Sequence, residues 1–145
     1  MSEPINPIVN ALNAPFWAAA DDGRLVLPTC VASGRAFWPP SPLSPFVSGG
    51  PVDWRSSSGE GTLLSVVVYR RVFQQAFAPR LPYGVALVAL DEGPRLLAFV
   101  ADPDAPDATR PGERAALGFA PVVEGGRNVP ILHSLRAPLE ERHDR

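Results

Sequence analysis

The chain has 145 residues, of which 46% are hydrophobic and 19% are charged, and its formal net charge is -2. This balance is typical of one folded domain, or of one small domain with an appendage, and it excludes a disordered chain. All basic residues are arginine and none is lysine, so the chain has no general attraction for a phosphate backbone and nucleic-acid binding is disfavoured.

A short helix is predicted near the N-terminus. Asn13 is a favourable N-cap, Pro15 is tolerated in a first turn, and Gly23 ends the helix. Residues 24–28 then form a short extended segment. Residues 29–54 contain five prolines and three glycines, which excludes a long helix or a central strand there.

The remainder of the chain has the pattern of short strands, rich in β-branched residues and separated by turns. The predicted strands cover residues 61–69, 83–90, 95–100, 115–123 and 129–135. Residues 91–94 have the composition of a hairpin turn. About five such strands predict a small closed or partly open β-barrel.

Cys30 is the single cysteine, so an intramolecular disulfide is excluded. The N-terminal residues lack the basic start and the uninterrupted apolar run of a secretory signal. The apolar stretch 63–69 is too short to cross a bilayer. We therefore expect a cytoplasmic protein without a membrane partner.

Several short motifs follow one another between residues 14 and 136. They are Phe16-Trp17, Gly23-Arg24-Leu25-Val26-Leu27, Cys30, Gly34, Phe37, Pro39-Pro40, Pro42, Trp54, Ser58-Gly59-Glu60-Gly61-Thr62, Pro82 to Leu90 and Gly93 to Leu97. In order and spacing they resemble a bacterial and archaeal family whose members carry a rubredoxin-like zinc ribbon followed by an OB fold.

The resemblance implies a mainly β fold, in which a short N-terminal helix and a degenerate zinc-ribbon module precede an OB-type β-barrel. The N-terminal arm and docking helix would occupy residues 1–28, and the ribbon module residues 29–54. The barrel would occupy residues 55–137, followed by a polar tail at 138–145.

In such relatives, two C-x-x-C pairs hold one tetrahedral zinc ion. The corresponding residues here are Cys30, Ser33, Ser44 and Val47. Serine is a poor zinc ligand at neutral pH, valine cannot ligate, and one thiolate alone would not retain the metal. We therefore predict that zinc is absent. Apolar packing is expected to hold the module together, through Phe37, Trp38, Phe46, Val47 and Trp54.

Members of the family are typically assembled with thiolase-like or synthase-like enzymes that act on acyl-CoA thioesters. The reactions include thiolysis, C-acylation and retro-aldol cleavage. The resemblance implies a non-catalytic accessory subunit that stabilises a thiolase-like partner and helps to form the CoA and acyl pocket. This chain would contribute no catalytic residue and bind no cofactor, and the CoA thioester would be the substrate of the complex.

Two groups of residues are the candidates for these roles. For the partner interface they are Phe16, Trp17, Phe37 and Trp38. For CoA binding they are Arg70, Arg71, Phe73, Phe77, Arg80 and Tyr83, since arginines suit phosphates and aromatic rings can stack on adenine. The alternatives are a helix that packs on its own barrel and a hairpin edge protected by charge.

Catalytic and metal sites elsewhere have simpler explanations. A Cys30–His133 dyad is disfavoured against a buried thiol, and His143 lies in the polar tail. Asp91 and Glu92 fit a hairpin turn better than an acid–base pair. A solvated loop explains Asp102, Asp104 and Asp107 better than a calcium site. The run Gly59-Glu60-Gly61 lacks the third glycine of a dinucleotide site.

Two other functions remain open from the sequence. One is a free-standing OB-fold protein that binds nucleic acid, against which the acidic balance argues. The other is an autonomous thioesterase or hydrolase, which a loss of activity in a His133→Ala variant would indicate.

Overall fold

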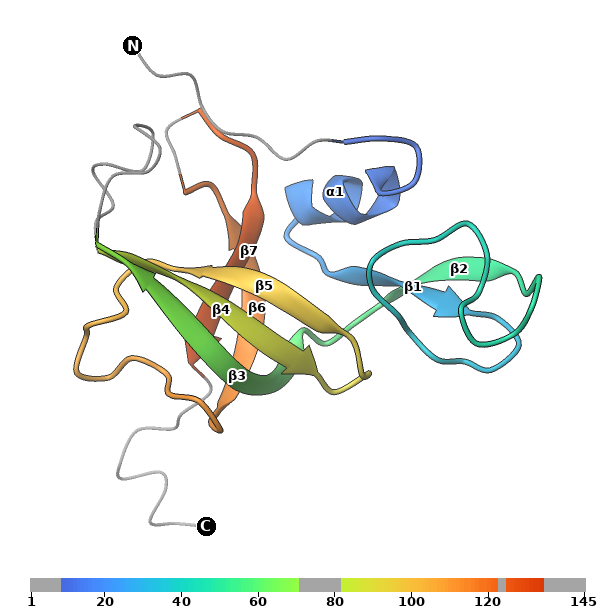
Figure 1. Cartoon of the computed structure of the whole chain (residues 1–145). Coiled ribbons are helices and arrows are strands. Elements are labelled where there is room, and N and C mark those ends of the chain that lie inside the picture. The colour runs from blue at the N-terminus through green and yellow to red at the C-terminus, as the bar shows by residue number, and fades with distance from the viewer. Residues whose placement is uncertain (1–8, 71–81, 123–124, 135–145) are drawn as a thin grey trace.

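The computed structural model describes residues 9–70, 82–122 and 125–134. Their elements are α1 (Ala14–Asp21), β1 (Val26–Cys30), β2 (Val52–Ser56), β3 (Glu60–Tyr69), β4 (Tyr83–Leu90), β5 (Arg95–Val100), β6 (Arg114–Ala120) and β7 (Val129–Ser134). β1 and β2 form a two-stranded sheet, and β3 to β7 form a closed barrel. In Figure 1 the helix and the small sheet lie together beside the barrel. The prediction of a mainly β chain with a five-stranded barrel after a short helix is confirmed.

Helix α1 begins and ends close to its predicted signals. Asn13 is the N-cap residue, but its side chain makes no capping hydrogen bond to the helix. At the other end Gly23 has φ +75°, and the N–H groups of Gly23 and Arg24 donate to Ala20 and Ala19. This is the Schellman arrangement, which favours glycine at the left-handed position. Among the described residues, no helix is long and apolar enough to cross a membrane.

The ribbon is organised by the antiparallel pairing of β1 with β2, from Val26 opposite Ser56 to Cys30 opposite Val52. The predicted extended segment at 24–28 is therefore a strand shifted by two residues. β2 was not predicted, because the prolines before it obscured a five-residue strand that begins just after Pro51. The small sheet thus extends beyond both ends of the range 29–54.

The barrel has the strand order β3-β4-β5-β7-β6, and β6 returns to β3 to close it. Neighbouring strands are antiparallel except β5 and β7, which are parallel. A bulge between Leu63 and Ser65 shifts the register of β3 against β4. Bulges of this kind increase the local bend and twist that a small barrel requires.

One hydrophobic core joins the three parts of the chain. Alternate residues of the barrel strands, such as Leu63, Val88 and Leu96, point inward and pack with Phe16 of α1 and Leu27 of β1. These side chains are at most 5% exposed. The helix and the ribbon are therefore held against the barrel by shared burial.

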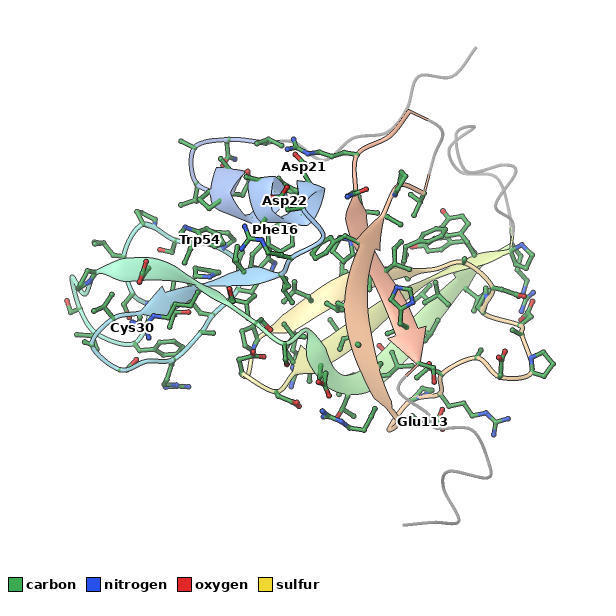
Figure 2. The ribbon with its side chains drawn as sticks, turned by 180° about the vertical axis from the view of Figure 1, so that it is seen from behind. Phe16, Asp21, Asp22, Cys30, Trp54 and Glu113 are labelled. Carbon is green, nitrogen blue, oxygen red and sulfur yellow. The ribbon has the colours of Figure 1, made fainter. Side chains whose placement is uncertain are left out.

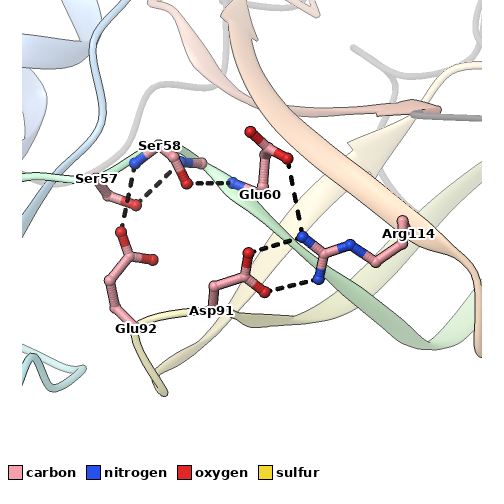
Figure 3. A network of polar contacts seen from close by, with 7 residues as sticks. Ser57, Ser58, Glu60, Asp91, Glu92 and Arg114 are labelled. Atoms are coloured by element: carbon pink, nitrogen blue, oxygen red, sulfur yellow. Dashed lines mark hydrogen bonds and ion pairs between the residues drawn. The ribbon is translucent and has the colours of Figure 1, made fainter.

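Polar contacts fix the same arrangement at the surface. Arg127, before β7, forms two hydrogen bonds of 3.1 and 2.8 Å with Asp21 at the end of α1. Within the barrel, Arg114 of β6 binds Asp91 of the β4–β5 turn through two hydrogen bonds of 2.7 Å (Figure 3). These contacts explain Asp91 as a structural residue, in agreement with the hairpin turn predicted there.

Candidate functional site

The four positions of the former zinc site come together in the ribbon. Cys30 ends β1 and is fully buried, and Ser44, which is 8% exposed, lies in the loop before β2. The N–H of Ser33 donates to the Cys30 sulfur at 3.4 Å. The Ser44 hydroxyl accepts the N–H groups of Phe46 and Val47 at 3.0 and 3.1 Å. Two turns thus direct N–H groups at a central Sγ and Oγ.

The turns also affect the ionisation of the thiol. Hydrogen bonds from the side chains of Ser33 and then Ser44 lower the pKa of Cys30 from 9.0 to about 7, against the opposing effect of desolvation. The hydroxyls therefore stabilise the thiolate. No histidine is among the groups that shift this pKa.

The donor set does not fit a structural zinc ion. One thiol, two neutral hydroxyls and an alkyl side chain stand where a tetrahedral site needs four ligands. Within residues 9–70, 82–122 and 125–134, no three His, Cys, Asp or Glu side chains are grouped to hold a metal. Whether the protein carries zinc in solution stays a prediction.

Aromatic side chains connect the two turns. The guanidinium of Arg35 lies 3.9 Å from the centre of the Phe46 ring, and Phe46 contacts Phe37 edge-on with ring centres 6.2 Å apart. Trp38 and Trp54 pack against the main core. The predicted packing role is confirmed for Phe37 and the two tryptophans. Phe46 is 37% exposed and contributes through its two ring contacts.

The four residues predicted to form the partner interface differ in their burial. Phe16 and Phe37 are 2% and 7% exposed, so their side chains offer little surface. Figure 2 shows Phe16 beneath α1, facing the rest of the chain, and its ring centre lies 4.7 Å from that of Trp38. Trp17 and Trp38 are partly exposed. An interface at these positions stays a prediction that depends on the two tryptophans.

Only two of the predicted CoA-binding residues lie in the described parts of the chain. Arg71, Phe73, Phe77 and Arg80 lie outside the described residues. Arg70 follows β3 directly and binds Asp104 through hydrogen bonds of 2.8 and 3.0 Å. A phosphate would therefore compete with Asp104 for this guanidinium, and the predicted role of Arg70 remains untested.

Tyr83 begins β4 and belongs to an aromatic stack on the outer face of the barrel. Its ring is stacked between Tyr69, at 5.1 Å, and Phe99, at 5.5 Å. Burial of Tyr83, with the nearby Tyr69, raises its pKa above 10.0. Tyr83 and Phe99 are each 8% exposed, so the stack braces the barrel and presents little ring surface to a ligand.

An apolar outer face, absent from the predictions, continues beside this stack. Val67, Val85, Leu87 and Leu97 point outward from β3, β4 and β5, because they alternate with the inward residues of the same strands. Leu97 is 62% exposed and Val67 57% exposed. Exposed apolar residues grouped in this way are typical of interaction surfaces.

The two residues of the alternative catalytic dyad, Cys30 and His133, lie on different parts of the fold. His133 lies on β7 beside Gly118 of β6, where a Cβ on the glycine would come within 2.6 Å of its Nε2. Cys30 lies in the ribbon, at the end away from the barrel (Figure 2). Glu92 accepts the N–H of Ser58 at 3.3 Å, in keeping with a structural role.

Comparison with known proteins identifies the two modules. Residues 17–43 match the family model of the ChsH2 rubredoxin-like zinc ribbon domain, and residues 54–120 match that of the ChsH2 C-terminal OB-fold domain. The probable enoyl-CoA hydratase alpha subunit of Thermomonospora curvata is 38% identical over 93 residues, which cover 63% of this chain. The chain spans only 28% of the length of that relative.

A solved structure extends the similarity to nearly the whole chain. One chain of the Ltp2-ChsH2(DUF35) aldolase superposes with a TM-score of 0.75 and is 31% identical in sequence. The match covers 90% of this chain and 99% of that one. The chain therefore belongs to the ChsH2 family of acyl-CoA-associated OB-fold proteins, in which a rubredoxin-like zinc ribbon precedes the OB fold.

Proposed function

We propose that the chain is a non-catalytic accessory subunit of an enzyme complex that acts on acyl-CoA thioesters. The observation that carries the proposal is the similarity over 99% of a chain in the Ltp2-ChsH2(DUF35) aldolase. A second relative is named as a probable subunit of an enoyl-CoA hydratase. Both names associate chains of this kind with multi-subunit enzymes.

The proposed lack of catalytic residues is supported by the arrangement of reactive groups. A nucleophilic cysteine needs a base within hydrogen-bonding reach. The neighbours that shift the Cys30 pKa are Ser33, Ser44 and the Ala32 backbone, and His133 lies against Gly118. The catalytic nucleophile or base would therefore come from the partner.

The proposed partner is a thiolase-like catalytic subunit, and the proposed reaction is thiolysis, C-acylation or retro-aldol cleavage. The apolar outer face with Val67 and Leu97, together with the half-buried Trp17 and Trp38, would supply its docking surface. The complex would be cytoplasmic, and this chain would stabilise the partner and complete its CoA and acyl pocket.

We also propose that the ribbon holds no metal ion. Two sets of contacts support this proposal, because they hold the turns of the ribbon without an ion. Cys30 and Ser44 accept hydrogen bonds from backbone N–H groups, and the ring of Phe46 contacts Arg35 and Phe37. In a zinc ribbon the bound ion itself supplies much of the folding free energy.

Native co-purification tests the proposal directly. The tagged chain should be isolated from its own host, its stoichiometric partner identified by mass spectrometry, and the acyl-CoA activity of the partner measured with and without the chain. We expect a hetero-oligomer whose activity or stability depends on this subunit. A chain that runs alone, beside a partner that is fully active without it, would refute the proposal.

A further inference from the structure

A pocket of about 400 Å³ lies at the end of the barrel where β3 and β5 finish. Its walls are inward-facing valines of the barrel and proline-rich residues of the β5–β6 loop. Prominent among them are Val66, Val68, Val100, Pro103, Pro106 and Pro111. The volume lies in the range of about 300–1,000 Å³ that is typical of small-molecule sites. The loop interpreted above as merely solvated therefore also forms one wall of a cavity.

The pocket follows from the incomplete pairing of β3. β3 pairs with β6 only from Glu60 to Thr62, so residues 101–113, which form no helix or strand, flank its second half. Gly84 faces them from β4. A Cβ there would lie 3.1 Å from Val66 Cγ1 and 3.4 Å from the Cβ of Pro103. The glycine therefore lets the loop approach the barrel closely.

The loop is anchored at both ends. Near its start Asp104 is held by Arg70 through two hydrogen bonds of 2.8 and 3.0 Å. Near its end the N–H of Gly112 donates to the carbonyl of Leu63 at 2.7 Å. The prolines between these anchors restrict the backbone further. A wall that is formed in advance reduces the ordering cost of binding a ligand.

The chemistry of the pocket favours hydrocarbon over phosphate. Most of its lining residues are valine, proline and alanine, although polar atoms also face the cavity, and its two charged residues, Asp104 and Arg110, are exposed. Asp102 and Asp107 are exposed on the same loop. Asp104 is already paired with Arg70. Asp102 and Asp107 place two further carboxylates on the loop that carries Arg110, which disfavours the approach of a polyanion. An apolar chain would gain from burial between the valines and prolines.

We propose that this pocket binds the acyl group of the thioester substrate, whereas the phosphates of coenzyme A are held outside it. The inference rests on the proposed function, because it assumes that the chain serves an acyl-CoA enzyme. It deepens that function by assigning the part of the substrate that this chain recognises. Substrate preference for acyl length would then depend in part on a subunit that performs no chemistry.

Calorimetric titration of the full chain tests the proposal without the nucleotide. The probes are butanoyl, hexanoyl, octanoyl and decanoyl thioesters of N-acetylcysteamine, and free coenzyme A serves as competitor. We expect saturable binding that tightens by up to about 4-fold for each methylene until the pocket is full. Free coenzyme A should not displace the octanoyl probe.

Two matched variants localise the site. Val68→Phe fills the pocket from β3, whereas Val67→Phe places the same ring on the outside, where Val67 is 57% exposed. Val68→Phe should weaken octanoyl binding at least about 10-fold, and Val67→Phe should change it less than about 2-fold. Ala105→Phe fills the pocket from the loop and provides a second test if Val68→Phe lowers the thermal stability.

The outcomes separate this inference from the proposed function. Absence of saturable acyl binding, equal effects of Val67→Phe and of both filling variants, or displacement by free coenzyme A would overturn the inference. If the chain still supports an acyl-CoA partner in that case, the proposed function stands and only the pocket assignment fails. If acyl binding follows the variants but no partner depends on the chain, the pocket assignment stands and the accessory role fails.

Discussion

The side chain of Ser44 acts on the thiol of Cys30 from the facing turn of the ribbon, where it helps to lower the pKa of that thiol. Ser44 accepts two backbone N–H groups from its own turn, and Cys30 likewise accepts one from its own turn. The turns of a zinc ribbon are therefore retained around two side chains that satisfy the N–H groups without four thiolates.

The ribbon should fold without zinc. Purified chain should contain well below one zinc per molecule by elemental analysis, and a chelator should leave its thermal unfolding midpoint unchanged, because the donor set cannot retain the ion. A stoichiometric zinc content, or unfolding on chelation, would contradict this prediction.

The retained geometry should allow a zinc site to be restored. In Ser33→Cys/Ser44→Cys/Val47→Cys, Cys30 and the three new thiols occupy the positions of two facing C-x-x-C pairs. We expect this variant to bind one zinc per chain and to unfold at a higher temperature with zinc than without it. The matched control adds Cys30→Ser, which should weaken zinc binding strongly. A triple variant that does not bind zinc would show that the two turns no longer face each other correctly.

The thiol of Cys30 should titrate near neutral pH. Its pKa is lowered from 9.0 to about 7 by Ser33 and Ser44, so the folded chain binds fewer protons than the unfolded chain between these values. Stability from this group should therefore rise between pH 7 and pH 9 and be absent below about pH 7. Thiolate absorbance and thermal unfolding against pH measure both effects. Ser33→Ala should raise the pKa more than Ser44→Ala, and a pKa that stays near 7 in both variants would contradict the assigned cause.

Two adjacent aromatic residues of α1 should behave differently. Phe16→Ala should destabilise the chain by about 3–5 kcal/mol, because Phe16 is 2% exposed and packs in the main core. Trp17→Ala should cost less stability, since Trp17 is only partly buried, but it should reduce recovery of the partner in co-purification. Chemical denaturation and quantitative pull-down separate the two effects. Full recovery of the partner with Trp17→Ala would remove Trp17 from the interface.

Asp104 should compete with phosphate for Arg70. If Arg70 contributes to CoA binding as predicted, Asp104→Asn should tighten CoA binding to the assembled complex by about 5-fold, equivalent to about 1 kcal/mol. The gain should shrink as salt is added. Arg70→Gln/Asp104→Asn should abolish the gain, and an unchanged affinity in Asp104→Asn would exclude Arg70 from the CoA site.

Much of the barrel was predictable because its signals are local. The strands at 83–90 and 95–100 were predicted with the bounds observed, since alternating burial and the turn at Gly93 both lie within a few residues of sequence. The former zinc site was recognised through the family resemblance, which aligns Cys30, Ser33, Ser44 and Val47 with the two C-x-x-C pairs of the relatives. β2 was missed because its five residues carry no comparable pattern after Pro51.

The sequence by itself determined the strand-and-turn pattern of the barrel, because that pattern depends on residue type and short spacing. Its resemblance to the family determined the zinc-ribbon and OB-fold assignment and the loss of zinc ligands. The tertiary structure alone decided the burial of Phe16, the ion pair of Arg70 with Asp104 and the pocket beside Val68. Each of these depends on residues from different elements meeting in space. Packing between distant segments determines which side chains remain available for a ligand or partner, and no local pattern encodes that choice.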